Sequence, residues 1–398
     1  MNTKLSNRVE KLQESETLKM AKLARQLIAD GKDIINLSIG EPDFDTPDHI
    51  KEAAIKAIND NITHYPPVAG FSELRQVIAK KYNTDFMCDY DFNQVIVSSG
   101  AKQSLSNAIL SLLDVGDEVI VPSPYWVSYP EMIKLSGADM VVIKAGIDTN
   151  YKITPQQLEE AITDKTRMFL FSSPSNPSGG VYCLGELEEL AKVFRKYPNI
   201  IIVADEIYDH INYVGGPCSF AMIKDLRDRV VIVNGVSKGF AMTGWRIGYM
   251  VAPLWLATAC NKLQGQLTSG PCTISQMAAL EALSSSLSST YKMRDEFKKR
   301  REIVVSMLSK ISGVKTNVPD GAFYSLIDIT SFFGKSYGNY TIEDSSDLAM
   351  FLLEDGNVSV VTGSAFGVPE CARISFATSE DNLRKAIGRI ESSLKKLK

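Results

Sequence analysis

The 398-residue chain is poor in the features that mark metal enzymes and disulfide-rich proteins. It has only three histidines and no HExxH motif, and its six cysteines are scattered and form no CxxC pair. Zinc sites and disulfide frameworks need such residues at defined spacings. The sequence therefore indicates no metal site and predicts reduced thiols, as in a cytoplasmic protein.

The chain also lacks long apolar runs and an excess of positive charge. Its longest apolar runs, such as "NIIIVAD", are far too short to span a bilayer. The N-terminal "MNTKLSNRVEKLQESETLKM" is polar and shows no apolar core of a secretory signal. The net charge is −4 at pH 7, which gives no basis for nucleic-acid binding. We expect a cytoplasmic protein with neither a membrane nor a nucleic acid as partner.

The composition is that of an ordinary globular protein, with 44% hydrophobic and 23% charged residues. From Thr46 to about residue 234, short apolar runs such as "QVIVSSG", "DEVIVPSP" and "RVVIVNG" alternate with helical patterns. Apolar strands that do not alternate with polar residues predict a mostly parallel sheet covered on both faces, an α/β fold. Thr46 is the expected N-cap of the first helix, with Pro47 at its first position, and Ser72 is the expected cap of the second.

The pattern changes after about residue 254. Long helical stretches are followed by shorter strands, which predicts a second, smaller α+β domain, and the serine-rich run 284–290 is the best candidate boundary. We interpret 46–288 as a large α/β domain, and 1–45 with 289–398 as the small domain.

Polar residues follow the predicted strands where a parallel sheet binds its ligands. Asp205 directly ends "NIIIVAD", and Asn176 follows "MFLFSS" between two prolines. Gly100 and the next two residues open a helix after "VIVSS", which is either a backbone anion site or a simple tight turn. Asp205 either awaits a cation or a hydrogen-bond donor, or caps the turn that follows it.

The segment "VNGVSKGFAMTGWRIGYM" contains two cations, Lys238 and Arg246, in an apolar run. Buried charges are costly unless they are paired. There is no GxGxxG motif, and "GFAMTGWR" lacks the Lys-Ser/Thr of a P-loop. A phosphorylated cofactor whose ring nitrogen needs an acid and whose aldehyde needs a lysine fits better, and pyridoxal 5′-phosphate meets both demands.

Seven further segments, in this order, resemble the class I aminotransferases, in particular the aspartate aminotransferase family and its bacterial-type subgroup. They are "NLSIGEPDFDTP", "YPPVAGFSELR", "SPYWVSYPEM", "SPSNPSG", "VADEIYDH", "SKGFAMTGWRIGY" and "RISFATSEDNLRKA". The resemblance covers nearly the whole chain. It implies the fold of fold-type I pyridoxal-phosphate transferases and a homodimer with shared active sites. It also implies transfer of the amino group of aspartate to 2-oxoglutarate, with the cofactor alternating between aldehyde and amine forms.

The resemblance also implies roles for individual residues. Lys238 would bind the cofactor covalently and move the substrate proton, and Asp205 would pair with the pyridine nitrogen. Tyr208 and Asn176 would bind the phenolic oxygen, and Trp126 would stack on the ring. The phosphate would be bound by Ser237, Arg246, the N–H groups around Ala101 and Lys102, and Tyr65 from the neighbouring subunit.

On the substrate side, the resemblance assigns the α-carboxylate to Arg373 and to the backbone at Gly40. No arginine occurs between Arg246 and Arg294, where some family members have the one that binds the distal carboxylate. A bacterial subgroup uses a lysine at the position of Lys102 instead. Ser15 and Thr17 match polar residues of an N-terminal segment that closes over an acidic substrate.

Three alternatives stay open at this stage. The preferred substrate could be an aromatic amino acid or prephenate, or the chain could be a lyase on the same scaffold. A non-catalytic regulator with this fold would carry an added DNA-binding domain, and we expect none because the match begins near residue 15.

Overall fold

The computed structural model describes residues 4–14, 16–216 and 218–398. Its largest element is a seven-stranded sheet with the order β2-β8-β7-β6-β5-β3-β4. The strands are β2 (Val95–Ser98), β3 (Glu118–Ser123), β4 (Asp139–Lys144), β5 (Thr166–Ser172), β6 (Ile201–Asp205), β7 (Val230–Gly235) and β8 (Gly248–Val251). Neighbouring strands from β4 to β7 are parallel, which confirms the predicted α/β fold.

Strand β8 is the exception, because it runs antiparallel to both β2 and β7. The sequence analysis did not assign this four-residue strand. A Cβ atom on Gly248 would lie 2.1 Å from the backbone nitrogen of Ala101, the first residue of α5 (Ala101–Leu112). Strand β8 therefore brings the segment after Lys238 into direct contact with the start of α5.

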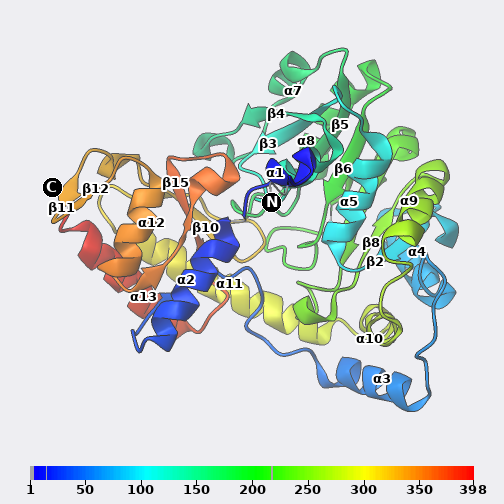
Figure 1. Cartoon of the computed structure of the whole chain (residues 1–398), viewed down its shortest axis with the longest axis horizontal. Helices are drawn as coiled ribbons and strands as arrows, with labels where there is room; N and C mark the ends of the chain where they lie inside the picture. Colours follow the sequence, from blue (N-terminus) through cyan, green and yellow to red (C-terminus); the bar gives the residue numbers. More distant parts are fainter. Residues whose placement is uncertain (1–3, 15, 217) are drawn as a thin grey trace.

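Helices cover both faces of this sheet (Figure 1). One face packs on α3 (Asp48–Asn59), α4 (Ser72–Phe86), α8 (Leu184–Lys196) and α10 (Thr273–Ser284), and the other on α5, α6 (Tyr129–Ser136) and α9 (Leu254–Leu267). Successive strand residues enter different cores: Val95 and Val97 belong to one and Ile96 to the other. Because both faces are buried, these strands have apolar residues at successive positions, and most of their polar residues lie at the strand ends.

The C-terminal part contains a smaller sheet with the order β14-β15-β10-β9. Its strands are β9 (Lys315–Thr316), β10 (Tyr324–Asp328), β14 (Val361–Thr362) and β15 (Cys371–Ser375). Two further pairs are β1 (Ile35–Asn36) with β13 (Val358–Ser359), and β11 (Ser336–Tyr337) with β12 (Tyr340–Thr341). The remaining α-helices are α1 (Asn7–Glu10), α2 (Glu16–Ala29), α7 (Pro155–Ala161), α11 (Ser288–Leu308), α12 (Ser345–Glu354) and α13 (Glu380–Leu394). The 3₁₀ helices are η1 (Phe92–Gln94), η2 (Ile147–Thr149), η3 (Phe220–Met222), η4 (Lys224–Arg229), η5 (Thr243–Trp245), η6 (Thr330–Phe332) and η7 (Gly363–Phe366).

The N-terminal helix α2 packs with this C-terminal part. Met20 and Ala24 of α2 share one hydrophobic core with Phe351 of α12 and Ile387 of α13. We propose on this basis that residues 1–45 and 289–398 form the small domain and residues 46–288 the large one. No helix in the described ranges is both long and apolar enough to cross a membrane.

Two predicted helix caps are wrong. Helix α3 begins at Asp48 after Pro47, and Thr46 instead donates from Oγ1 to the carbonyl oxygen of Ala241 at 2.7 Å. Thr46 Oγ1 also accepts a hydrogen bond from Trp245 Nε1 at 3.0 Å. Thr46 thus supports the segment after Lys238 rather than its own helix. Ser72 is already the first residue of α4 and donates to Glu73.

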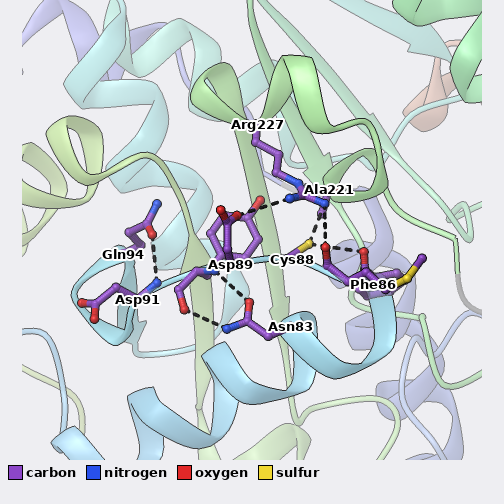
Figure 2. A network of polar contacts seen from close by, with 10 residues as sticks. Asn83, Phe86, Cys88, Asp89, Asp91, Gln94, Ala221 and Arg227 are labelled. Atoms are coloured by element: carbon purple, nitrogen blue, oxygen red, sulfur yellow. Dashed lines mark hydrogen bonds and ion pairs between the residues drawn. The ribbon is translucent and has the colours of Figure 1, made fainter.

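Figure 2 shows a polar network at the C-terminal end of α4. Arg227 Nε donates to the carbonyl oxygen of Ala221 at 2.7 Å, and Arg227 Nη2 donates to that of Met87 at 3.1 Å. Cys88 Sγ lies 3.5 Å from the same Ala221 oxygen. The network fixes the end of α4 to the segment η3–η4. Like the other five cysteines, Cys88 is unpaired, as predicted.

Candidate active site

The predicted site residues gather at one edge of the large sheet. Strands β2, β3, β5, β6 and β7 run in the same direction, so their carboxyl ends share this edge. Asp205 is the last residue of β6, and Lys238 follows β7. Helix α5 follows β2, Trp126 follows β3, and Asn176 follows β5. The edge therefore combines an amine, a carboxylate, an amide, an indole and a helix N-terminus.

Lys238 is half-buried, and its Nζ donates to the carbonyl oxygen of Gly40 at 2.5 Å. Burial lowers its pKa to about 8, against the attraction of Glu41, and the cations Arg246 and Arg373 act in the same direction as burial. A substantial fraction of this amine is therefore unprotonated near neutral pH, which makes it a possible nucleophile and base.

Asp205 is 4% exposed and forms no ion pair within the described ranges. Its Oδ2 accepts a hydrogen bond from Tyr129 Oη at 2.7 Å, and its Oδ1 accepts one from the N–H of Ile207 at 3.3 Å. Burial raises the pKa of Asp205 to about 6, while these two donors and Lys238 lower it. Asp205 thus accepts a hydrogen bond within the turn that follows it, which was one of the two alternatives considered from the sequence. It also presents a buried carboxyl group to the site.

An anion cradle lies where α5 begins. Gly100 precedes the helix with φ +85°, and no side chain caps the N-terminus. A Cβ atom on Gly100 would lie 2.3 Å from Arg246 Nη2. The guanidinium of Arg246 therefore lies directly on the N-terminal turn of α5, and both attract an anion. Ser237, which precedes Lys238, is buried at 7% exposure.

Lys102, the second residue of α5, points toward Trp126. Its Nζ lies 4.9 Å from the centre of the Trp126 ring, and Trp126 in turn packs edge-on against Tyr129. Burial lowers the pKa of Lys102, and Arg246 acts in the same direction. The structure thus places Lys102 beside the ring that was predicted to stack on the cofactor.

Arg373 is the most buried cation of the site, at 2% exposure. Its Nη1 donates to Asn176 Oδ1 at 2.9 Å and its Nη2 to the carbonyl oxygen of Ser38 at 2.7 Å, while Nε has no hydrogen-bond partner among the described residues. Its Cζ lies 4.4 Å from the centre of the Tyr324 ring and 5.0 Å from that of Phe366. Its described partners are all neutral, so the buried charge is suited to an anionic ligand.

Tyr208 is buried, and its hydroxyl lies 2.8 Å from that of Tyr324. The ring of Tyr208 lies 5.9 Å from Lys238 Nζ. Burial raises the pKa of the Tyr208 hydroxyl well above its ordinary value, so it is a neutral hydrogen-bonding group.

The remaining predicted site residues are Tyr65, Thr17 and Ser15. Tyr65 is 95% exposed. Thr17 lies half-buried on α2, and Ser15 lies outside the described residues. No cluster of metal-binding side chains occurs in the described ranges.

The sequence analysis missed Tyr129 and Tyr324. Tyr129 lies in the quoted segment "SPYWVSYPEM", but nothing in the sequence indicates that its hydroxyl reaches Asp205. Tyr324 lies outside all the quoted segments, in "GAFYSLIDI". A phenol beside apolar residues at the start of a predicted strand was the available signal, since buried hydroxyls need partners.

Comparison with known proteins shows the family. Residues 32–390 match the family model described as aminotransferase class I and II. An aspartate/prephenate aminotransferase of Nitrosomonas europaea is 45% identical over 98% of this chain and 100% of its own length. The aspartate aminotransferase of Rhizobium meliloti superposes over all of both chains with a TM-score of 0.96 at 39% identity. That of Thermus thermophilus, solved with maleate, covers 98% of this chain and 100% of its own, with a TM-score of 0.93 at 38% identity. The chain therefore belongs to the class I and II aminotransferases.

Proposed function

We propose that the chain is a pyridoxal-phosphate-dependent aminotransferase that moves the amino group of aspartate to 2-oxoglutarate. The observation that carries this proposal is the presence, in one site, of the half-buried amine of Lys238, whose pKa is lowered, and the buried guanidinium of Arg373, whose described partners are all neutral. The first suits an aldehyde and the second a carboxylate. Pyridoxal phosphate, when bound, supplies an aldehyde for the amino group and an electron-withdrawing ring.

The residues at the sheet edge fit this cofactor. Arg246, Ser237 and the N–H groups at the start of α5 would hold the phosphate, because the cradle at Gly100 combines a cation with a helix N-terminus. Trp126 would stack on the ring, and Tyr208 and Asn176 would bind its phenolic oxygen. Tyr65 would reach the phosphate of a partner subunit in a homodimer, and its 95% exposure is compatible with that role.

Asp205 and Lys238 would perform the proton chemistry. The buried carboxylate of Asp205 would keep the ring nitrogen protonated. The positive charge of that nitrogen would in turn offset the effect of burial, which raises the pKa of Asp205. Lys238 would hold the cofactor covalently through its aldehyde group in the resting enzyme, with loss of water. Once the amino group of the substrate has displaced it, the free Nζ amine would take the proton from the α-carbon of the substrate as a general base.

The substrate would be held at both ends. Arg373, with the backbone at Gly40, would bind the α-carboxylate. Lys102 would bind the distal carboxylate of aspartate or glutamate, and Thr17 with Ser15 would close over it. Relatives named as aspartate/prephenate aminotransferases favour a second substrate, prephenate, which also carries carboxylates. We place the enzyme in the cytoplasm.

The Lys102→Ala variant tests the acidic-substrate proposal. Loss of one member of a charge pair costs roughly 2–5 kcal/mol when buried, and Lys102 is partly exposed, so we expect kcat/KM for aspartate to fall about 10- to 100-fold. Phenylalanine has no distal carboxylate, so its kcat/KM should change far less.

Lys51→Ala is the matched control, because Lys51 is an exposed lysine that pairs with Asp48 on α3. It should leave the ratio of aspartate to phenylalanine turnover unchanged. An unchanged ratio in Lys102→Ala would reject Lys102 as the distal-carboxylate residue. Prephenate, assayed in parallel, ranks the two proposed substrates, and analysis of the products would reveal lyase chemistry.

A further inference from the structure

Tyr324, the first residue of β10, contacts three separate parts of the site. Its hydroxyl lies 2.8 Å from that of Tyr208, and its ring centre lies 4.4 Å from Cζ of Arg373. A Cβ atom added to Gly40, whose carbonyl oxygen binds Lys238, would lie 3.0 Å from Tyr324 Oη. The side chain is fully buried, and no role proposed above belongs to it.

The sheet register explains why the ring meets the guanidinium. Leu326 of β10 pairs with Arg373 of β15, and Tyr324 pairs with Ser375. Tyr324 and Arg373 are therefore diagonal neighbours on one face of the small sheet. Since the hydrogen bonds of Arg373 go only to Asn176 and Ser38 among the described residues, the aromatic contacts complete the fixation of its planar group.

The hydroxyl of Tyr324 contacts Tyr208 rather than Arg373. A phenol has one hydrogen to donate. If Tyr208 donates it to the phenolic oxygen of the cofactor, its own oxygen must accept the hydrogen bond from Tyr324. The hydroxyl of Tyr324 would then determine the direction in which Tyr208 donates.

We propose that Tyr324 is a positioning residue for both halves of the site: its ring fixes Arg373 and its hydroxyl fixes Tyr208. One side chain of the small sheet would thus align the carboxylate-binding guanidinium with a group of the large sheet. The proposal rests on the function proposed above and adds a residue to it.

Two variants separate the two contacts. Tyr324→Phe keeps the ring and removes the hydroxyl, so the holoenzyme should release its cofactor on dialysis with a roughly fivefold higher dissociation constant. Its KM for L-alanine, which has only an α-carboxylate, should stay within about twofold of wild type. Tyr324→Leu also removes the aromatic face, so its KM for L-alanine should rise about tenfold or more while kcat changes less.

Tyr182→Phe is the matched control for a purely structural loss. Tyr182 is also buried, at 5% exposure, and its hydroxyl accepts a hydrogen bond from the N–H of Ile153 at 2.9 Å. The variant should lower the melting temperature without changing cofactor release or the KM for L-alanine. If Tyr324→Leu and Tyr324→Phe behave as Tyr182→Phe does, Tyr324 is structural and the proposal is overturned.

A double-mutant cycle with Gly40→Ala tests the contact directly. In the wild-type background the new methyl group meets Tyr324 Oη and displaces the ring, so the KM for L-alanine should rise about tenfold. In the Tyr324→Phe background the nearest remaining ring atom, Cζ, lies 4.0 Å away, which is an ordinary contact. Gly40→Ala should then add less than about twofold.

An equal cost of Gly40→Ala in both backgrounds would overturn the proposal, even if Tyr324→Leu fails to fold. If the proposed function itself is wrong, the result is distinguishable, because the wild-type enzyme would then transfer no amino group from any donor. Cofactor release from Tyr324→Phe would still report on the hydroxyl contact in that case.

Discussion

The two arginines of the site are held in opposite ways. Arg246 is exposed and lies in the same segment as Lys238 and Ser237, next to the N-terminus of α5. Arg373 is buried, and its contacts come from Ser38, Asn176 and Tyr324, which are far apart in the sequence. The proposed phosphate side is thus built largely from one continuous segment, whereas the proposed carboxylate side is assembled from distant parts of the chain. Residues of one continuous segment can be recognised in the sequence as a motif, whereas contacts between distant residues cannot.

The largest effect should come from Lys238, the centre of the continuous segment. Lys238→Ala removes both the covalent attachment and the general base, so kcat should fall by about 10³-fold or more. The cofactor should remain bound noncovalently, because Arg246 and the start of α5 are unchanged. Borohydride reduction of the wild-type enzyme followed by peptide mapping identifies the attached residue, and a label on a different lysine would refute the assignment.

The proposed carboxylate side, around Arg373, should be nearly as sensitive, even to a substitution that keeps the positive charge. Arg373→Lys keeps the charge but cannot contact both Asn176 and Ser38, and a buried acceptor left unpaired costs about 1–3 kcal/mol. We expect kcat/KM for aspartate to fall roughly 100-fold. Arg246→Lys lies on the exposed side and should cost about tenfold or less in cofactor affinity. Equal losses in the two variants would remove the distinction between the two sides.

A smaller, pH-dependent effect tests the burial of Lys238. Its pKa is lowered to about 8, so the reactive neutral amine increases as the pH rises through that value. Between pH 7 and 9 its reductive methylation in the cofactor-free chain should accelerate about tenfold, against about a hundredfold for an ordinary surface lysine. Mass spectrometry of the modified peptides gives both rates in one experiment. A hundredfold acceleration at Lys238 would mean that its pKa is not lowered.

The smallest effect tests whether the segment after Lys238 needs the contacts of Thr46 to keep its structure. Thr46→Val removes the hydrogen bonds to Ala241 and Trp245 and should lower the free energy of unfolding by about 1 kcal/mol. Ser72→Ala, at the other wrongly predicted cap, should stay within about 0.5 kcal/mol. Urea titration measures both values. Hydrogen exchange should increase around residues 241–245 in Thr46→Val, and an increase confined to α3 would instead support the capping role.

The sequence alone predicts the α/β fold, the parallel strands and the polar residues that follow them. Strands buried on both faces are mainly apolar, and the carboxyl ends of parallel strands lie at one edge, so Asp205 and Lys238 could be assigned to that edge without coordinates. Only the tertiary structure placed Tyr129 against Asp205, Tyr324 against Arg373 and Tyr208, and Thr46 against Trp245. It also decided that β8 runs antiparallel between β2 and β7. These contacts join residues far apart in the chain, and hydroxyl and aromatic groups have no spacing rule that reveals their partners. Their pairing depends on how the sheets pack, which local pattern does not encode.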